Sequence, residues 1–191
     1  MRAENPSGTD DDADLVSRVA QGDRTAYAVL VRVYAPRFLA VASRIMGDRA
    51  QAEDMVQDAF IKLWTKAGDF DPSKARFTTW FHRILVNRCL DEKRKRRPDQ
   101  LAEGFDMPSH EKTAEERVAD GHRARAIQQA LLTLPVRQAT AIVLTYTEGY
   151  SNQTAADMMG VGVKALESLL VRGRKTLKDQ LDPELLTWAA D

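Results

Sequence analysis

Apolar residues recur at helical spacing along nearly the whole chain, and this pattern limits the fold more than any other feature. In residues 25–46 they fall three or four positions apart, as one face of an α-helix requires. The same spacing recurs in residues 49–67, 77–95, 114–132, 135–148 and 163–181. The period-two alternation of a half-buried strand is nearly absent. The sequence therefore predicts an all-α fold.

A break in the helical pattern divides the chain into two small domains. Residues 98–113 lack periodicity and contain two prolines, a glycine and several acids, a composition typical of a flexible connection. We therefore expect one helical domain over residues 12–97, a linker over 98–113 and a second helical domain over 114–181. Each domain is small, so its core is modest, and binding to a partner is expected to add stability.

Charges of opposite sign are segregated along a chain whose formal net charge is zero. Residues 74–97 hold nine Lys or Arg against two acids, and residues 162–178 hold five against one. Between them, residues 98–121 hold seven acids against two bases. Two basic surfaces separated by an acidic connection favour a polyanion as partner. The alternative is that each run is a solvated helix face.

The sequence also argues against several classes of protein. No run approaches the roughly 18 apolar residues of a membrane span, and the N-terminus lacks a signal-peptide core, so we expect a cytoplasmic protein. The single cysteine, Cys89, allows no disulfide and no CxxC metal site. The histidines are scattered, and the motifs HExxH, GxxxxGK[ST] and GxSxG do not occur. We expect no enzyme activity, no catalytic residue, no metal, no cofactor and no small-molecule substrate.

The C-terminal segment has the pattern of a helix-turn-helix. Ser151 can cap a short helix that ends at Gly160, and a longer basic helix begins at Val163. The second helix of such a pair is narrow enough to enter the major groove of DNA. The side chains expected to reach bases or phosphates there are Ser168, Arg172, Arg174 and Lys175. The alternative is an ordinary helical hairpin with a basic exposed face.

Residues 78–97, TTWFHRILVNRCLDEKRKRR, combine aromatic residues with a basic block. The polar side chains that fall near one another on this helix are Thr79, Arg83, Asn87 and Arg88. An exposed ring beside Asn and Arg suits single-stranded nucleic acid, because bases stack on rings while Arg holds phosphate. The alternative is that Trp80 and Phe81 are core residues. We expect residues 93–97 to contact phosphate, since such dense like charge repels itself unless it is neutralised.

Together with a third segment, these two resemble a known family. The third segment is AEDMVQDAFIKLW, residues 52–64, which alone predicts only an amphipathic helix. It is followed by FDPSKARFTTWFHRILVNRCLDEKRKRR at 70–97 and by LPVRQATAIVLTYTEGYSNQTAADMMGVGVKALESLLVRGRKTL at 134–177. In this order the segments are similar to bacterial sigma-70 factors of RNA polymerase. The resemblance is to the extracytoplasmic-function (ECF) group, which keeps only the second and fourth sigma domains.

The resemblance implies partners and a role for each segment. The partners are core RNA polymerase (the β′ clamp helices and the β flap), promoter DNA and, as is common in the family, an anti-sigma factor. The positions that match contacts to β′ are Asp54, Gln57, Asp58, Phe60, Leu63 and Trp64. Those that match the −10 surface are Phe70, Lys74, Arg76, Thr79, Trp80, Arg83, Asn87, Arg88, Lys93, Arg94, Arg96 and Arg97. Those that match the −35 surface are Ser151, Glu167, Ser168, Val171, Arg172, Arg174 and Lys175.

The chain departs from the family in the helix expected to contact the −35 element. Where many members carry basic residues, this chain has Glu167 and Leu169, within the run ALESL. The helix is therefore less cationic than usual. A glutamate in the groove can accept a hydrogen bond from cytosine N4 but repels phosphate.

The resemblance favours a sigma factor that directs promoter-specific transcription initiation, with the acidic linker in the nucleic-acid channel of the polymerase. Two other functions stay open. A stand-alone helix-turn-helix regulator would bind duplex DNA without polymerase and would not need residues 52–64. A sigma-like decoy that sequesters an anti-sigma factor usually carries a receiver domain and often lacks DNA-facing charges. Here the basic block of residues 93–97 is present.

Overall fold

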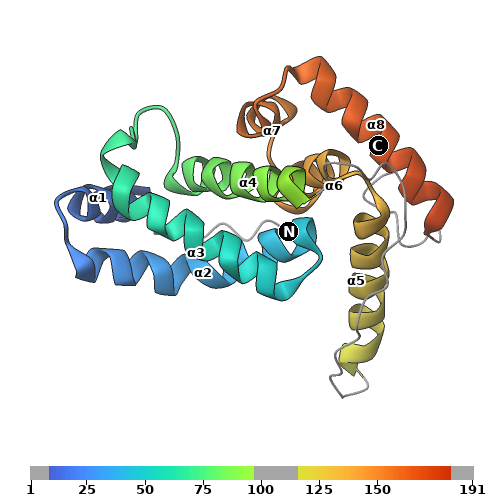
Figure 1. Cartoon of the computed structure of the whole chain (residues 1–191), viewed down its shortest axis with the longest axis horizontal. Helices are drawn as coiled ribbons and strands as arrows, with labels where there is room; N and C mark the ends of the chain where they lie inside the picture. The colour runs from blue at the N-terminus through green and yellow to red at the C-terminus, as the bar shows by residue number, and fades with distance from the viewer. Residues whose placement is uncertain (1–8, 97–115, 182–191) are drawn as a thin grey trace. The chain divides into compact units, whose positions relative to one another are not determined.

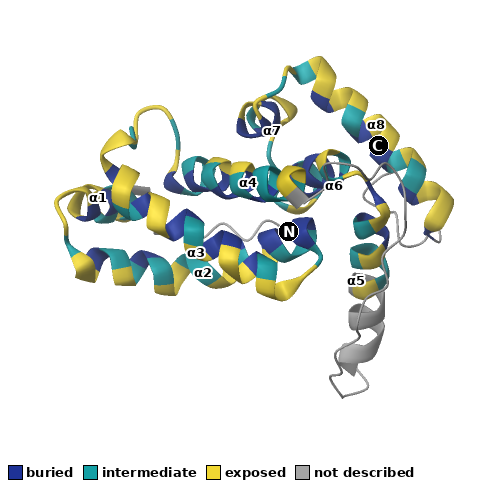
Figure 2. Ribbon diagram, in the orientation of Figure 1, coloured by how far each residue is buried: buried dark blue, intermediate teal, exposed yellow. Residues whose placement is uncertain are grey.

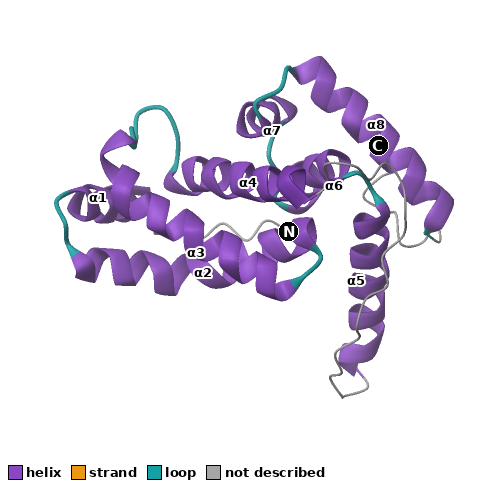
Figure 3. Cartoon of the chain, viewed as in Figure 1, coloured by secondary structure: helices purple, strands orange, loops and turns teal. Residues whose placement is uncertain are grey.

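The computed structural model describes residues 9–96 and 116–181 (Figure 1). Within those two ranges every regular element is a helix and none is a strand (Figure 3), which confirms the predicted all-α fold. The chain separates into two compact units, residues 1–43 with 48–89 and residues 44–47 with 90–191. The predicted linker, Arg97 and the side chain of Arg96 lie outside the described residues.

The first unit is built from α1 (Thr9–Ala20), most of α2 (Arg24–Met46), α3 (Arg49–Lys66) and most of α4 (Phe77–Arg96). A short 3₁₀ turn, η1 (Ala67–Asp69), extends α3. Apolar spacing alone places the start of α1 near Asp14, but the helix begins at Thr9. The three aspartates at 10–12 belong to its first turn, where negative charge is favoured by the helix dipole.

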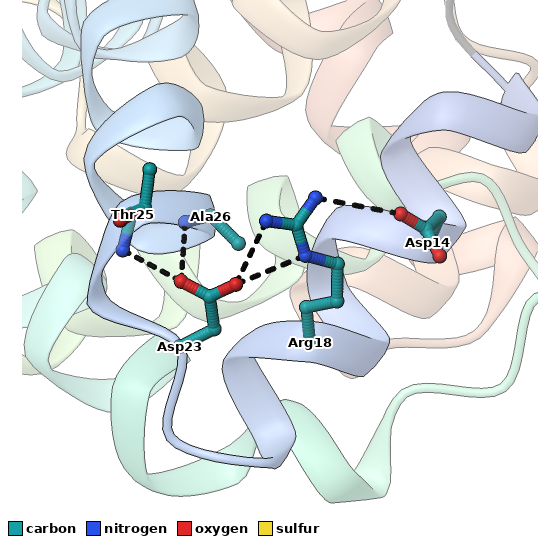
Figure 4. A network of polar contacts seen from close by, with 5 residues as sticks. All are labelled: Asp14, Arg18, Asp23, Thr25 and Ala26. Carbon is teal, nitrogen blue, oxygen red and sulfur yellow. Dashed lines mark hydrogen bonds and ion pairs between the residues drawn. The ribbon is translucent and has the colours of Figure 1, made fainter.

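A small polar network fixes the turn between α1 and α2 (Figure 4). The Asp23 carboxylate accepts hydrogen bonds from the backbone N–H groups of Thr25 (2.8 Å) and Ala26 (3.1 Å), as a helix N-cap does. Arg18 donates to its other oxygen from Nε (3.0 Å) and Nη2 (2.8 Å), while Nη1 lies 3.8 Å from Asp14. The backbone bond from Ala26 and the Arg18 guanidinium lower the pKa of the Asp23 carboxyl group.

Aromatic rings from three helices form the centre of the first unit. Phe38 of α2 and Phe81 of α4 are fully buried, and Phe60 of α3 is 4% exposed. The ring centroids are 4.3 Å apart for Phe38 and Phe81, 4.7 Å for Phe60 and Phe81, and 6.4 Å for Phe38 and Phe60. His82, also fully buried, packs edge-on against Phe38 at 4.8 Å. This cluster decides which face of each helix points inward.

Within the described residues, α2 is the helix whose length and composition would also allow it to cross a membrane. This is weak support for a membrane span, because the core helix of a soluble protein passes the same test. Leu30, Phe38, Val41 and Ala42 of α2 are fully buried in the first unit, and the ribbon of α2 carries buried as well as exposed residues (Figure 2). α2 therefore has the position of a core helix.

The described part of the second unit contains α5 (Glu116–Thr133), α6 (Val136–Ile142), α7 (Asn152–Met159) and α8 (Val163–Gln180). A π-helical turn, η2 (Val143–Thr147), continues α6. Its core side chains with 2% exposure or less include Ile142, Leu144, Met158, Leu166 and Leu177. α6 and α8 approach closely at Gly173, where an added Cβ would lie 2.7 Å from Ile142 Cδ1.

The first helix of the helix-turn-helix, α7, begins and ends at the predicted capping residues. Ser151 Oγ accepts a hydrogen bond from the Thr154 N–H at 3.2 Å and so caps α7. α7 ends at Gly160, whose φ of +62° lies in the left-handed region that glycine adopts without strain. α8 then starts one residue after Gly162.

Truncation of the central ring is expected to destabilise the first unit. Phe38→Ala should lower its free energy of unfolding by about 3–5 kcal/mol, because a cavity is left between buried rings. Val33→Ala on the same helix is the control, since Val33 is 54% exposed and should change stability by less than about 0.5 kcal/mol. Urea denaturation followed by circular dichroism measures both variants. Equal destabilisation by the two substitutions would contradict this description of the core.

Candidate nucleic-acid and protein interfaces

One side of α3 is polar and exposed, while the other belongs to the core. Asp54 and Gln57 are exposed and Asp58 is half-buried, so all three remain candidates for a partner surface. Phe60 and Leu63 are 4% and 0% exposed. Both lie on the buried apolar stripe of the helix, and Phe60 also lines the groove described next; their contact with a partner stays a prediction.

An apolar groove with a volume of about 580 Å³ lies between α2 and α3. Ile61 and Gln57 stand at its α3 side, and Ile61 is 53% exposed. Trp64 packs edge-on against Tyr27 of α2, with ring centroids 5.3 Å apart. An apolar groove beside polar side chains is the type of surface that accepts a helix of a partner protein. The lining residues are Tyr27, Val31, Ala35, Pro36, Leu39, Glu53, Val56, Gln57, Phe60 and Ile61.

An ion pair joins α3 to α4. The guanidinium group of Arg88 contacts the carboxylate of Asp58, and the two side chains are 20% and 42% exposed. Sequence reasoning assigned Asp58 to a protein-binding surface and Arg88 to a DNA-binding one. Because each charge is partly neutralised by the other, Arg88 is less available for phosphate than the exposed Arg83. The pair therefore joins one residue of the predicted protein-binding surface to one residue of the predicted DNA-binding surface.

The loop before α4 is held by its own side chains. The Asp71 carboxylate accepts hydrogen bonds from the Ser73 hydroxyl (2.6 Å) and N–H (3.0 Å), and Lys74 Nζ lies 2.8 Å from it. The hydrogen bonds from Lys74 and Ser73 lower the pKa of the Asp71 carboxyl group to about 2. Lys74 and Arg76 are both exposed, but Lys74 is already paired with Asp71. A DNA phosphate must therefore compete with Asp71 for Lys74.

Half-buried rings connect this loop to α4. Phe70 lies 5.4 Å from Trp80 and 6.4 Å from Phe77, measured between ring centroids. Phe70, Thr79 and Trp80 are half-buried. Of the alternatives left open for the two aromatic residues, Phe81 is a core residue, while Trp80 keeps part of its ring accessible. Accessible ring surface beside cationic side chains can stack on an unpaired base.

The polar side of α4 carries exposed groups at helical spacing. Arg83, Asn87 and Arg94 are exposed, and Lys93 is half-buried. Arg94 lies 3.1 Å from Asp91 in an ion pair within the helix. An amide that can hydrogen-bond base edges is thus flanked along the helix by guanidinium groups that can bind phosphate.

Exposed side chains form one continuous row along α8, called here the α8 row: Lys164, Glu167, Ser168, Val171, Arg172 and Lys175. Their spacing of three or four places them on one side of the helix, opposite the buried Leu166, Leu170 and Leu177. Ser168 Oγ donates to the Lys164 carbonyl oxygen at 2.9 Å, and Arg172 Nε donates to the Ser168 carbonyl oxygen at 3.2 Å. Val171 is 58% exposed, an apolar side chain within a polar row.

Two residues predicted for the same surface have different surroundings. Ser151 uses its hydroxyl group to cap α7, as described above. Arg174 is half-buried at the edge of the α8 row. Lys164, by contrast, was not predicted and lies within the row. Lys164 lies three residues before Glu167, and residues three or four apart share one side of a helix, so this spacing could have predicted its place in the row.

Comparison with known proteins identifies the family. The model of Sigma-70 region 2 matches residues 30–98, and the model of Sigma-70 region 4 matches residues 124–177. The ECF RNA polymerase sigma factor SigW of Bacillus subtilis is 30% identical over 177 residues, which cover 87% of this chain and 94% of SigW. The chain belongs to the ECF group of the sigma-70 family.

Two further similarities agree with this assignment. The ECF RNA polymerase sigma factor SigM of Mycobacterium tuberculosis is 34% identical over 166 residues, which cover 87% of this chain and 82% of SigM. Among solved structures, CnrH in complex with the cytosolic domain of CnrY matches with a TM-score of 0.62 at 30% identity. That match covers 88% of this chain and 96% of CnrH. Sigma factors are transcription regulators, which is the class of protein to which this chain belongs.

The Asp58–Arg88 pair in this sigma factor is expected to stabilise the contact between α3 and α4. A double-mutant cycle with Asp58→Asn and Arg88→Gln should give a coupling energy of about 1 kcal/mol, because the pair is partly shielded from water. The control cycle uses Arg49 and Glu53 on α3, whose side chains are 81% and 53% exposed; it should give about 0.3 kcal/mol. Urea denaturation measures both. A coupling energy no larger than that of the control pair would show that the Asp58–Arg88 pair stabilises the fold no more than an exposed ion pair does.

Asp71 is expected to remain ionised at unusually low pH. Its pKa is lowered in the folded chain from 3.8 to about 2, so its contribution to stability is fully present above pH 3.8 and is lost as the pH falls through about 2. The measurement is an NMR titration of the Asp71 carboxyl carbon. In Lys74→Ala the pKa should move up toward the usual value, because the largest cause of the shift is removed. A titration near 3.8 in the unmodified chain would rule out the described loop.

Proposed function

We propose that this chain binds core RNA polymerase through its first helical domain and directs it to promoters that both domains contact. The proposed division keeps residues 12–97 for polymerase binding and the −10 element, and residues 114–181 for the −35 element. The observation that carries the proposal is the separation of two kinds of surface on the first unit: an apolar groove at α2 and α3, and a cationic, aromatic surface at α4.

The groove and the exposed side of α3 are the proposed polymerase-binding surface. Asp54 and Gln57 supply exposed polar groups at its edge, and Ile61 supplies exposed apolar area. A helical partner such as the β′ clamp helices suits this geometry, since a helix can insert apolar side chains into the groove. Phe60 lines the groove, and Trp64 packs against Tyr27, which also lines it.

The loop at 70–76 and the outer side of α4 are the proposed −10 surface. Strand opening needs no chemistry, because binding energy from captured bases can offset unstacking, which costs a few kcal/mol per base. Trp80 and Phe70 offer ring surface, Asn87 offers an amide for base edges, and Arg83 and Arg94 offer cations for phosphate. The α8 row is the proposed −35 surface, with its helix in the major groove.

A protein inhibitor is the proposed means of control. CnrH, which is 30% identical to the chain, was solved in complex with the cytosolic domain of CnrY. We propose an anti-sigma factor that covers the groove between α2 and α3 and so competes with polymerase for the same apolar area. The proposed location is the cytoplasm, where polymerase and DNA are found, and no reaction of its own is assigned to the chain.

Transcription with purified components tests the function directly. Adding the chain to core RNA polymerase should produce transcripts with defined start sites from a library of promoter fragments. Core polymerase alone should not select those starts. Absence of start-site selection, together with absence of any complex between the chain and core polymerase, would overturn the proposal.

Two sets of substitutions should separate polymerase binding from DNA binding. Asp54→Ala with Gln57→Ala should weaken core binding about tenfold, as expected when side chains at a protein interface are truncated. Arg94→Ala with Arg96→Ala and Arg97→Ala should leave core binding unchanged but weaken promoter binding. The salt dependence of promoter binding should also fall, by about 0.9 in the log–log slope for each phosphate that the variant no longer neutralises.

Fluorescence anisotropy with labelled core polymerase and with labelled promoter DNA measures the two affinities. Val33→Ala, an exposed position on α2, serves as a control for both sets. If the arginine substitutions reduced core binding as much as promoter binding, the proposed division of roles would be wrong.

A further inference from the structure

The α8 row has cationic side chains toward its two ends and acidic, hydroxyl and apolar side chains between them. Lys164 stands at the N-terminal end, and Arg172 with Lys175 stands toward the C-terminal end. Lys164 and Lys175 are separated by about 16 Å along the helix axis at 1.5 Å per residue. The major groove is about 12 Å wide, so the end groups can reach phosphates on opposite sides. The middle of the row then faces the base edges.

Two side chains in the middle of the α8 row, Glu167 and Val171, do not suit contact with phosphate. Glu167 is acidic. It is exposed, and within the described residues no ion pair neutralises it. In the major groove a carboxylate accepts a hydrogen bond from cytosine N4, whereas guanine presents only the acceptors O6 and N7 there. Glu167 therefore favours cytosine and disfavours guanine at the base pair that it meets.

Val171 is the second side chain in the middle of the α8 row that does not suit contact with phosphate. Its side chain is 58% exposed although it is apolar, and it lies one helical turn after Glu167. The thymine C5-methyl group is the apolar feature of the major groove, and contact between two apolar groups removes both from water. Four residues span about 6 Å of helix, comparable to about two base-pair steps of 3.4 Å. Glu167 and Val171 can thus meet base pairs about two steps apart in one element.

We propose that α8 selects its upstream DNA element by a cytosine that hydrogen-bonds to Glu167 and a nearby thymine whose methyl group contacts Val171. This inference rests on the proposed function only in placing α8 in the −35 major groove. The flanking cations supply affinity without regard to sequence. Sequence selectivity comes from one acidic and one apolar side chain.

The selectivity is tested with a duplex library randomised across the upstream element. The full-length chain is used in two arms, alone at low salt and in complex with core polymerase, and bound DNA is sequenced. The unmodified chain should enrich cytosine over guanine at one position by about tenfold, equivalent to about 1.4 kcal/mol. Glu167→Gln should move that preference toward adenine, because glutamine pairs with adenine N6 and N7.

Asp179→Asn is the matched control for charge. Asp179 is an exposed acid one helical turn beyond Lys175, at the C-terminal end of the same helix and 12 residues from Glu167. Both substitutions remove one negative charge from α8, so both should strengthen the sequence-independent part of DNA binding to a similar degree. Only Glu167→Gln should change which base is enriched. If the two variants enriched the same bases as the unmodified chain, Glu167 would act through charge alone and the proposal would be overturned.

The contact of Val171 is tested by removing only the methyl group from DNA. Replacing the enriched thymine with uracil should weaken binding by the unmodified chain about fourfold, in line with the removal of a single buried methyl group worth about 0.8 kcal/mol. Val171→Ala should bind the thymine and uracil duplexes nearly equally. An equal thymine-to-uracil ratio in both proteins would overturn the assignment of Val171.

The two arms separate this inference from the proposed function. If the chain failed to direct transcription but its free form showed the cytosine and thymine preferences, α8 would be a DNA-recognition helix of a protein with another role. If the polymerase complex initiated transcription at defined starts but neither arm showed these preferences, the proposed function would stand and this inference would fail.

Discussion

The contact among Phe38, Phe60 and Phe81 is the interaction on which the first unit depends. These rings come from α2, α3 and α4 and lie within 4.3–6.4 Å of one another. Turning any of the three helices by one residue, about 100°, would carry its ring out of the cluster. The cluster therefore decides that Asp54 and Gln57 face outward on α3 and that Arg83 and Asn87 face outward on α4. The polar side chains of the proposed binding surfaces therefore lie on the outward sides of the core helices.

In the second unit, aliphatic side chains instead of aromatic rings decide which side of a helix is buried. Leu166, Leu170 and Leu177 bury one side of α8, and Gly173 lets α6 approach that side closely. The opposite side is left exposed as the α8 row. Because inward positions are fixed by packing, outward positions are free to vary in chemistry. Glu167 and Val171 can thus change what the helix recognises without changing how it folds.

The sequence alone was sufficient for the features that depend on neighbours along the chain. Helical spacing predicted an all-α fold, and Ser151 and Gly160 predicted the ends of α7, since caps act within one turn. It was insufficient where tertiary packing decides. Phe60 and Leu63 occupy positions of the same apolar stripe whether they touch a partner or the core, and only packing distinguishes the two. Likewise, the groove needs side chains from both α2 and α3, and Asp58 and Arg88 are 30 positions apart.

The basic surface of a chain with zero net charge is weaker than its residue count indicates. Lys74 is paired with Asp71, Arg88 with Asp58 and Arg94 with Asp91. Each pair lowers the positive potential that a phosphate meets, and DNA must exchange one ion pair for another to bind. Such exchange gives little net affinity on its own, so the free chain should hold DNA weakly. A partner that brings promoter DNA close raises the effective concentration of phosphate, and the same cations then suffice. Paired cations thus suit a subunit that must recognise promoters only when it is bound to polymerase.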